Sequence, residues 1–198
     1  ITKEIPRKIA VYWDNSFSAS KRNIEKELNL LESYLTSLRG TKEVILIAFN
    51  QKVSPPELFQ INQDASKIIQ SIQHLNNDGA TCLDDLKFGH GYDEILLFSD
   101  AVNTIGESDI KTSAMPVYAI TSGNGSNYTL LKRIASGSNG EFIDLNVVSV
   151  EKALETMKAD EEKFLSCTFN PSDIKEVFPN SACRVDEYFD LAGILTTD

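Results

Sequence analysis

Cysteine, histidine and long hydrophobic runs are scarce in this sequence. Its 198 residues include three cysteines and two histidines, and none of them follows CxxC or another zinc-binding spacing. No apolar stretch approaches the length of a membrane span, and the start shows no signal-peptide pattern. Because the first residue is Ile1 rather than Met, we expect the sequence to be a mature or excised piece of something longer.

Positive charge is also in short supply. Lys and Arg number 19 against 29 Asp and Glu, which gives a net charge of −10. Binding to phosphate backbones and anionic membrane surfaces depends on clustered basic side chains. We therefore expect neither nucleic acid as a partner nor direct membrane insertion. A phosphate loop of the GxxxxGK[ST] type is missing, as is GxGxxG after the first apolar run, which disfavours phosphoryl transfer.

Apolar runs of strand length alternate with amphipathic stretches of helix length. The expected strands are 8–13, 44–49, 94–99, 116–121 and 140–145, and the expected helices are 20–38, a segment capped by Asp64, a short piece after Thr81, 127–136 and 149–164. Segment 51–59 contains Pro55-Pro56 and suits a turn followed by an edge strand. The central strands are apolar throughout, which is typical of a parallel sheet covered by helices on both faces.

We therefore predict a Rossmann-like, doubly wound α/β fold over residues 1–164. From about Phe164 the sequence pattern changes to short apolar groups between turn residues. This pattern predicts a β-like C-terminal extension over 165–198, which we interpret as the start of a β-rich domain. Cys167 and Cys183 share this segment, and they either pair, in an extracytoplasmic protein, or remain free thiols. The sequence leaves both states open.

Polar side chains follow two of the expected strands directly. Asp14, Ser16 and Ser18 stand at alternate positions after the first strand, and Ser99-Asp100 follows the apolar run 95–98. Thr81 lies in the turn between them. Ligands of parallel sheets bind beyond the carboxyl ends of the strands, near a topological switch point. Hydroxyl and carboxylate oxygens are the ligands that Mg²⁺ prefers, so this pattern predicts a metal site. The alternative is that Ser16, Ser18 and Asp100 merely cap helices.

At these positions the chain resembles a von Willebrand factor type A domain, the family that includes integrin inserted domains, from about Arg7 to Phe164. The metal-ion-dependent adhesion site of that family is Asp-x-Ser-x-Ser, then a Thr and then an Asp, and it is matched here by Asp14, Ser16, Ser18, Thr81 and Asp100. The resemblance implies one antiparallel edge strand and Mg²⁺ as the bound metal, with Mn²⁺ or Ca²⁺ as alternatives. Ala101 departs from the family, which often has Gly there.

The resemblance further implies an interaction or cell-adhesion module, not an enzyme, in which an Asp or Glu carboxylate of a protein partner completes the metal shell. An extracytoplasmic location is expected: cell surface, periplasm or secreted. The region around Trp13-Asp14 and the tail from Phe178 to Gly193 also resemble bacterial relatives of inter-alpha-trypsin inhibitor heavy chains.

Two alternatives remain. One is a Mg²⁺-dependent hydrolase similar to haloacid-dehalogenase-like phosphatases, but those enzymes need a second Asp where this chain has Ser16, and a hydroxyl cannot protonate the leaving group. The other is a structural scaffold module with no metal-mediated ligand.

Overall fold

The computed structural model describes residues 5–83, 86–103, 113–159, 163–164, 166–179, 183–185 and 189–196. The chain divides into two compact units, the larger formed by Thr2–Ala159 and the smaller mainly by Asp160–Asp198. Among the described residues, no helix combines the length and apolarity needed to cross a membrane.

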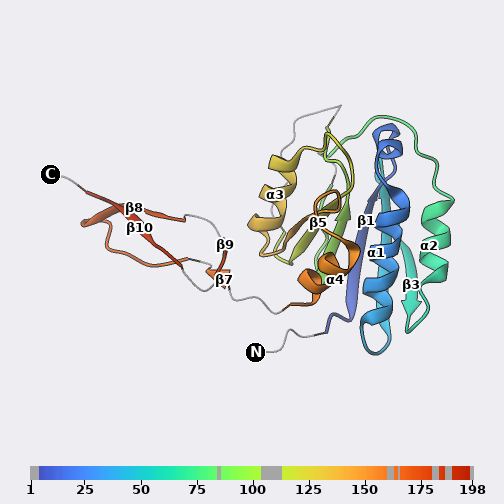
Figure 1. The fold of residues 1–198 in the computed structure, drawn as a ribbon, viewed down its shortest axis with the longest axis horizontal. Helices are drawn as coiled ribbons and strands as arrows, with labels where there is room; N and C mark the ends of the chain where they lie inside the picture. The colour runs from blue at the N-terminus through green and yellow to red at the C-terminus, as the bar shows by residue number, and fades with distance from the viewer. Residues whose placement is uncertain are drawn as a thin grey trace. The chain divides into compact units, whose positions relative to one another are not determined.

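The larger unit is built on a six-stranded sheet (Figure 1). In spatial order its strands are β3 (Glu57–Ile61), β2 (Lys42–Phe49), β1 (Lys8–Asp14), β4 (Glu94–Phe98), β5 (Val117–Thr121) and β6 (Phe142–Asp144). All neighbours pair in parallel except β3, which runs antiparallel to β2 at the edge. The predicted doubly wound α/β sheet with one antiparallel edge strand is confirmed.

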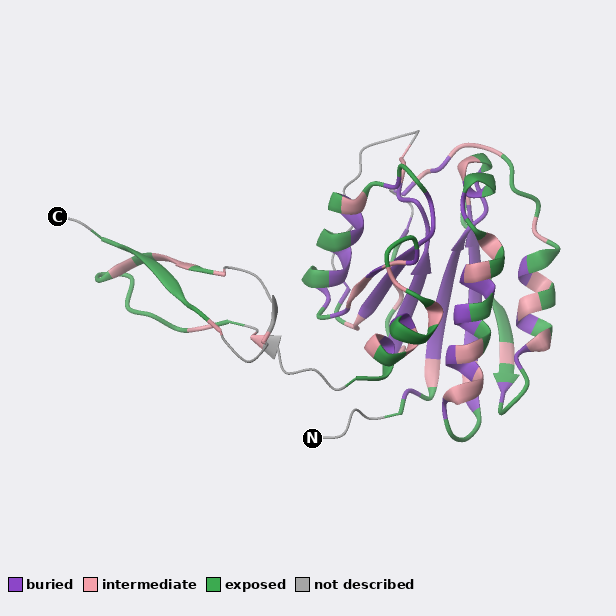
Figure 2. Ribbon diagram, in the orientation of Figure 1, coloured by how far each residue is buried: buried purple, intermediate pink, exposed green. Residues whose placement is uncertain are grey.

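Helices cover both faces of this sheet, as Figure 1 shows. They are α1 (Ile24–Ser37), α2 (Ser66–Gln73), α3 (Tyr128–Gly137) and α4 (Val150–Lys158). Alternate residues of a strand point to opposite faces, so Val11 and Trp13 pack with α1, α2 and α4, whereas Ala10 and Tyr12 pack with α3. Burial on both faces makes most of the length of the central strands purple in Figure 2 and explains why their sequences are apolar without alternation.

The helix expected over 20–38 is interrupted, which corrects the prediction. Residues Phe17–Lys21 form a 3₁₀ helix, η1, and the α-helix begins only at Ile24. Its N-cap is Asn23, whose side chain accepts a hydrogen bond from Lys26 N at 3.0 Å. The break occurs because Arg22 is drawn into the interior, where it is 5% exposed, and a continuous helix would place it differently.

Two further helix predictions were wrong in extent. The described residues of 81–90 contain no helix, although Leu83 and Leu86 are buried as expected. The helix α4 ends at Lys158 rather than continuing to 164. Residues 158–163 read Lys-Ala-Asp-Glu-Glu-Lys, so beyond Met157 no large apolar side chain is available to continue the buried face of the helix.

The smaller unit consists of short antiparallel strands, as expected for the C-terminal extension. Its strands are β7 (Lys163–Phe164), β8 (Ile174–Phe178), β9 (Cys183–Arg184) and β10 (Ala192–Leu195), paired as β7 with β9 and β8 with β10. The β10 strand is exposed along its whole length. Cys82 and Cys167 are free thiols.

Candidate metal centre

The sheet brings two polar loops together at its carboxyl edge. Strands β1 and β4 are parallel neighbours, with Trp13 opposite Phe98, so the residues that follow them leave the sheet side by side. From β1 the chain winds toward β2 and β3, and it later returns to build β4, β5 and β6 on the other side. The space between the ends of β1 and β4 is therefore the topological switch point, where ligands of such sheets bind.

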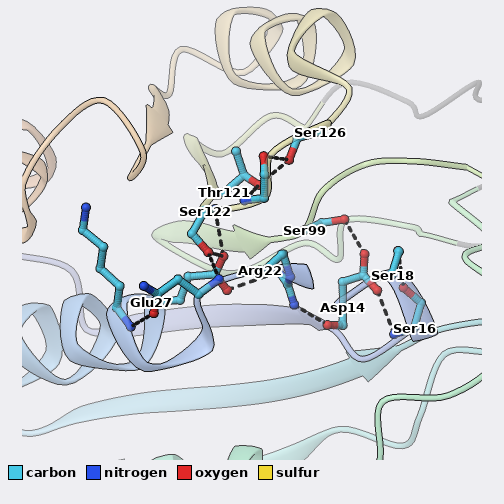
Figure 3. Close-up of polar contacts among 12 residues, drawn as sticks. Asp14, Ser16, Ser18, Arg22, Glu27, Ser99, Thr121, Ser122 and Ser126 are labelled. Atoms are coloured by element: carbon cyan, nitrogen blue, oxygen red, sulfur yellow. Dashed lines mark hydrogen bonds and ion pairs between the residues drawn. The ribbon is translucent and has the colours of Figure 1, made fainter. Parts of the chain in front are cut away.

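The loop after β1 gathers three of the predicted site residues, as Figure 3 shows. Asp14 Oδ1 accepts a hydrogen bond from Ser16 N at 2.9 Å, and the hydroxyls of Ser16 and Ser18 lie 3.0 Å apart. Ser16 occupies the N-cap position of η1 but makes no side-chain capping bond. The capping alternative is therefore wrong for Ser16, whose hydroxyl instead faces that of Ser18.

Ser99 connects the two loops. Its hydroxyl donates to Asp14 Oδ2 at 2.6 Å and accepts from Ala101 N at 2.9 Å. Asp100 folds back so that its Oδ1 accepts from Val102 N at 3.0 Å. Ala101 has a φ of 51°, a left-handed conformation that glycine adopts with less strain.

The loop that carries Thr81 is fastened to the loop after β1 by the main chain. Phe17 N donates to Gly79 O at 2.9 Å, and Asp78 N donates to Asn15 O at 3.0 Å. Thr81 itself is buried. Thus Asp14, Ser16 and Ser18 contact one another directly, whereas Thr81 and Asp100 lie on two loops that adjoin them.

The two aspartates of the candidate site are buried and have no ionic partner among the described residues. Asp14 is fully buried and Asp100 is 5% exposed. Among the described residues the ion pairs are Arg22 with Glu27 and Lys152 with Glu155, so neither aspartate belongs to one. No three His, Cys, Asp or Glu side chains in the same ranges gather closely enough to hold a metal. Two buried, unpaired carboxylates beside serine hydroxyls fit Mg²⁺, since a buried charge needs a counter-charge.

A buried polar network behind this centre was not predicted from the sequence (Figure 3). Arg22 donates through Nη2 to the main-chain oxygen of Asp14, and its Nη1 lies 3.3 Å from Glu27 Oε2. Glu27 Oε1 accepts from both N and Oγ of Ser122, at 3.0 and 2.6 Å. Burial raises the pKa of Glu27, while Arg22 and Ser122 oppose that rise. Arg22 and Glu27 are five residues apart, which is not a helical pairing distance, so no local spacing marks them.

No protein-family model matches this sequence, and no curated protein matches it either. Solved structures do match. A Bacteroides fragilis aerotolerance-related membrane protein is 14% identical over 76% of this chain and 96% of its own, with a TM-score of 0.53. Proximal thread matrix protein 1 from the mussel byssus is 16% identical over 83% of this chain and half of its own, with a TM-score of 0.53.

A third solved structure carries the family name expected from the sequence. It is a von Willebrand factor type A protein from Catenulispora acidiphila, 13% identical over 88% of this chain and 49% of its own, with a TM-score of 0.56. At these identities the likeness concerns the fold. The chain has the fold of a von Willebrand factor type A domain.

Proposed function

We propose that this protein is a divalent-cation-dependent protein-binding module. The observation that carries the proposal is the pair of buried carboxylates, Asp14 and Asp100, which have no ionic partner among the described residues. Ser16, Ser18 and Thr81 would supply neutral oxygens, and the carboxylates would hold the cation directly or through its waters. Mg²⁺ is the proposed ion because it accepts few protein ligands and retains water.

A protein partner's Asp or Glu carboxylate is proposed to complete the site. A dication held mainly by hydroxyls keeps enough positive charge to attract that carboxylate. Both oxygens of Asp14 already accept hydrogen bonds, from Ser16 N and Ser99 Oγ, which favours contact with the cation through water and leaves a coordination position for the partner. An extracytoplasmic location is proposed with this function, since one structural neighbour is described as a membrane protein and another comes from the mussel byssus.

Binding is proposed in preference to phosphate-ester hydrolysis. A haloacid-dehalogenase-like mechanism needs a carboxylic acid two residues after the first Asp, and here that position is Ser16, whose hydroxyl lies against Ser18. A hydroxyl does not supply the acid that protonates a leaving group.

Thermal melts test the metal site. Chelator-stripped wild type should melt at a higher temperature when Mg²⁺ or Mn²⁺ is added, because a ligand that binds only the folded state stabilises it. Asp14→Ala should lose this shift. Asp93→Ala is the matched control, since Asp93 also accepts main-chain hydrogen bonds, from Arg7 N and Lys8 N, but near the amino end of the sheet. An equal shift in Asp14→Ala, or none in the wild type at millimolar metal, would refute the site.

Displayed peptides test the partner's chemistry. A random library with a fixed central Asp is selected on the protein in Mg²⁺, beside the same library with Asn at that position. The Asp library should yield binders that are released by chelator, and the Asn library should not. Binders obtained equally from both libraries, or retained in excess chelator, would contradict recognition of a carboxylate through a metal.

A further inference from the structure

The Arg22 guanidinium lies buried directly behind the candidate metal centre. Its side chain is fully buried and meets two different elements: the main-chain oxygen of Asp14 at the end of β1, and Glu27 in the first turn of α1. The guanidinium also lies over the ring of Trp13, 5.5 Å from the ring centroid. These contacts tie the chain segment that begins at Asp14 to α1.

Glu27 extends this contact to the loop after β5. Its Oε1 receives both hydrogen bonds from Ser122, and Ser122 Oγ in turn accepts from Asn23 N at 2.7 Å. The next residue, Gly123, lies close to both Arg22 and Asp100: a Cβ at this position would lie 3.3 Å from Arg22 Cγ and 3.6 Å from Asp100 Cβ. The Arg22–Glu27 pair therefore touches the loops after β1 and β5 and lies beside the loop after β4.

We propose that Arg22 is a positioning residue for the cation site, acting through the Asp14 main chain, with Glu27 cancelling its positive charge. This inference rests on the proposed metal-binding function. A cation next to a site for a dication repels it, so Arg22 is useful there for its geometry and needs a buried counter-charge. Glu27 supplies that counter-charge and also orients the guanidinium, and residues that orient a metal site commonly affect metal affinity by about 10–100-fold.

The direction in which Arg22→Gln changes Mg²⁺ affinity separates a geometric role of Arg22 from a purely electrostatic one. If Arg22 acted only as a positive charge, Arg22→Gln would tighten Mg²⁺ binding. If it positions Asp14, then both Arg22→Gln and the charge-conserving Arg22→Lys should weaken Mg²⁺ binding by about 10-fold or more. Lys cannot reproduce the rigid two-pronged contact to Asp14 and Glu27. Ca²⁺ binding should weaken less in Arg22→Lys, because Ca²⁺ tolerates a looser geometry than Mg²⁺.

The matched control is Tyr34, which lies on α1, the helix that carries Glu27, at the opposite end of the sheet. The Tyr34 hydroxyl donates to the Glu94 carboxylate, and both residues are buried. Tyr34→Phe should lower the melting temperature while leaving Mg²⁺ affinity unchanged. A variant with both Arg22→Met and Glu27→Met removes the ion pair without leaving a buried charge unpaired. This double variant replaces the single Arg22 variants in the experiment if those fail to fold.

The experiment is calorimetric titration of the chelator-stripped, folded proteins with Mg²⁺ and with Ca²⁺. The expected result is weaker Mg²⁺ binding in all Arg22 variants, a reduced preference for Mg²⁺ over Ca²⁺ in Arg22→Lys, and no change in Tyr34→Phe. Mg²⁺ affinities within twofold of wild type, or tighter binding in Arg22→Gln, would overturn the positioning role. Failure of the wild type itself to bind Mg²⁺ would instead refute the proposed function.

Discussion

Replacing Asp14 by Asn should have opposite effects on stability with and without metal. In the absence of metal, the Asp14 carboxylate is fully buried without an ionic partner. An Asn side chain has nearly the same shape: its oxygen can accept from Ser16 N, and its amide can donate to Ser99 Oγ, but the hydrogen of the buried Ser99 hydroxyl then loses Asp14 Oδ2 as its acceptor. The substitution thus removes the charge and keeps the neighbouring atoms in place, with one hydrogen bond reversed.

The magnitude follows from two opposing contributions. Burying an ionised carboxylate costs several kcal/mol even after relaxation, whereas changing two charge-assisted hydrogen bonds to neutral ones loses about 1 kcal/mol each. The Ser99 hydroxyl hydrogen that loses its acceptor costs about a further 1 kcal/mol or more, so in chelator Asp14→Asn should be more stable than the wild type by at most about 1–2 kcal/mol. In Mg²⁺ at 100 times its dissociation constant, the wild type gains about 2.7 kcal/mol and the variant does not. For a domain of this size that gain raises the melting temperature by about 5–11 °C.

The assay is a pair of thermal melts of each protein, one in chelator and one in Mg²⁺, with urea unfolding to convert melting temperatures to free energies. The expected result is a reversal of the order of stability between the two conditions. A variant that is less stable than the wild type by the same amount in both conditions would show that Asp14 only holds the loop through hydrogen bonds. That outcome would refute the reasoning that an unpaired buried charge awaits a cation.

Four other substitutions test the fold and the buried charge of Glu27. Ala101→Gly should shift the melting temperature by no more than a few degrees, because relief of the left-handed φ, about 1 kcal/mol, offsets loss of a buried methyl group. Gly140→Ala should cost about 3 kcal/mol or more in urea unfolding, since its Cβ would lie 2.0 Å from Val117 O, whereas Gly40→Ala, with open space around it, should cost only about 1 kcal/mol. In chelator, the wild type should lose stability relative to Glu27→Gln as the pH rises above 4.5, the ordinary pKa of a glutamate. Burial raises the pKa of Glu27, so above that pH the folded state holds a proton that the unfolded state releases. Urea unfolding midpoints measured below and above pH 4.5 check the direction of this change.

The sheet could be predicted because its signal is local and repeated. Runs such as 95–98 are apolar at every position, which separates a strand buried on both faces from an amphipathic helix. Once the strands are parallel, the residues after β1 and β4 must leave from the same edge, and the nearness of Asp14 to Asp100 follows from topology alone. The assignment of Asp14, Ser16, Ser18, Thr81 and Asp100 as metal ligands stays a prediction.

The interrupted first helix could not be predicted in this way. Ile24, Leu28, Leu31 and Leu35 keep helical spacing, and nothing in that spacing separates residues 20–22 from the helix that follows. The break depends on Arg22 entering the interior, which requires Glu27 and the loop at Ser122, 95 residues further along the chain. A residue pattern over the length of one helix does not reveal a partner so far along the chain. Among the described residues after Thr81 no helix forms, and the segment just before it is tied to the loop after β1 by main-chain bonds from Asp78 N and to Gly79 O.

The buried charges around the switch point form one set. Asp14, Asp100 and Glu27 are carboxylates, and Arg22 is the cation paired with one of them. With Glu27 ionised, the set has two more negative than positive charges, which is the excess that the proposed divalent cation would balance. Without Glu27, the positive charge of Arg22 would cancel half of that excess and weaken the attraction for a dication. In the proposed cation site, the glutamate that could not be found by spacing would therefore be the group that compensates the buried positive charge of Arg22.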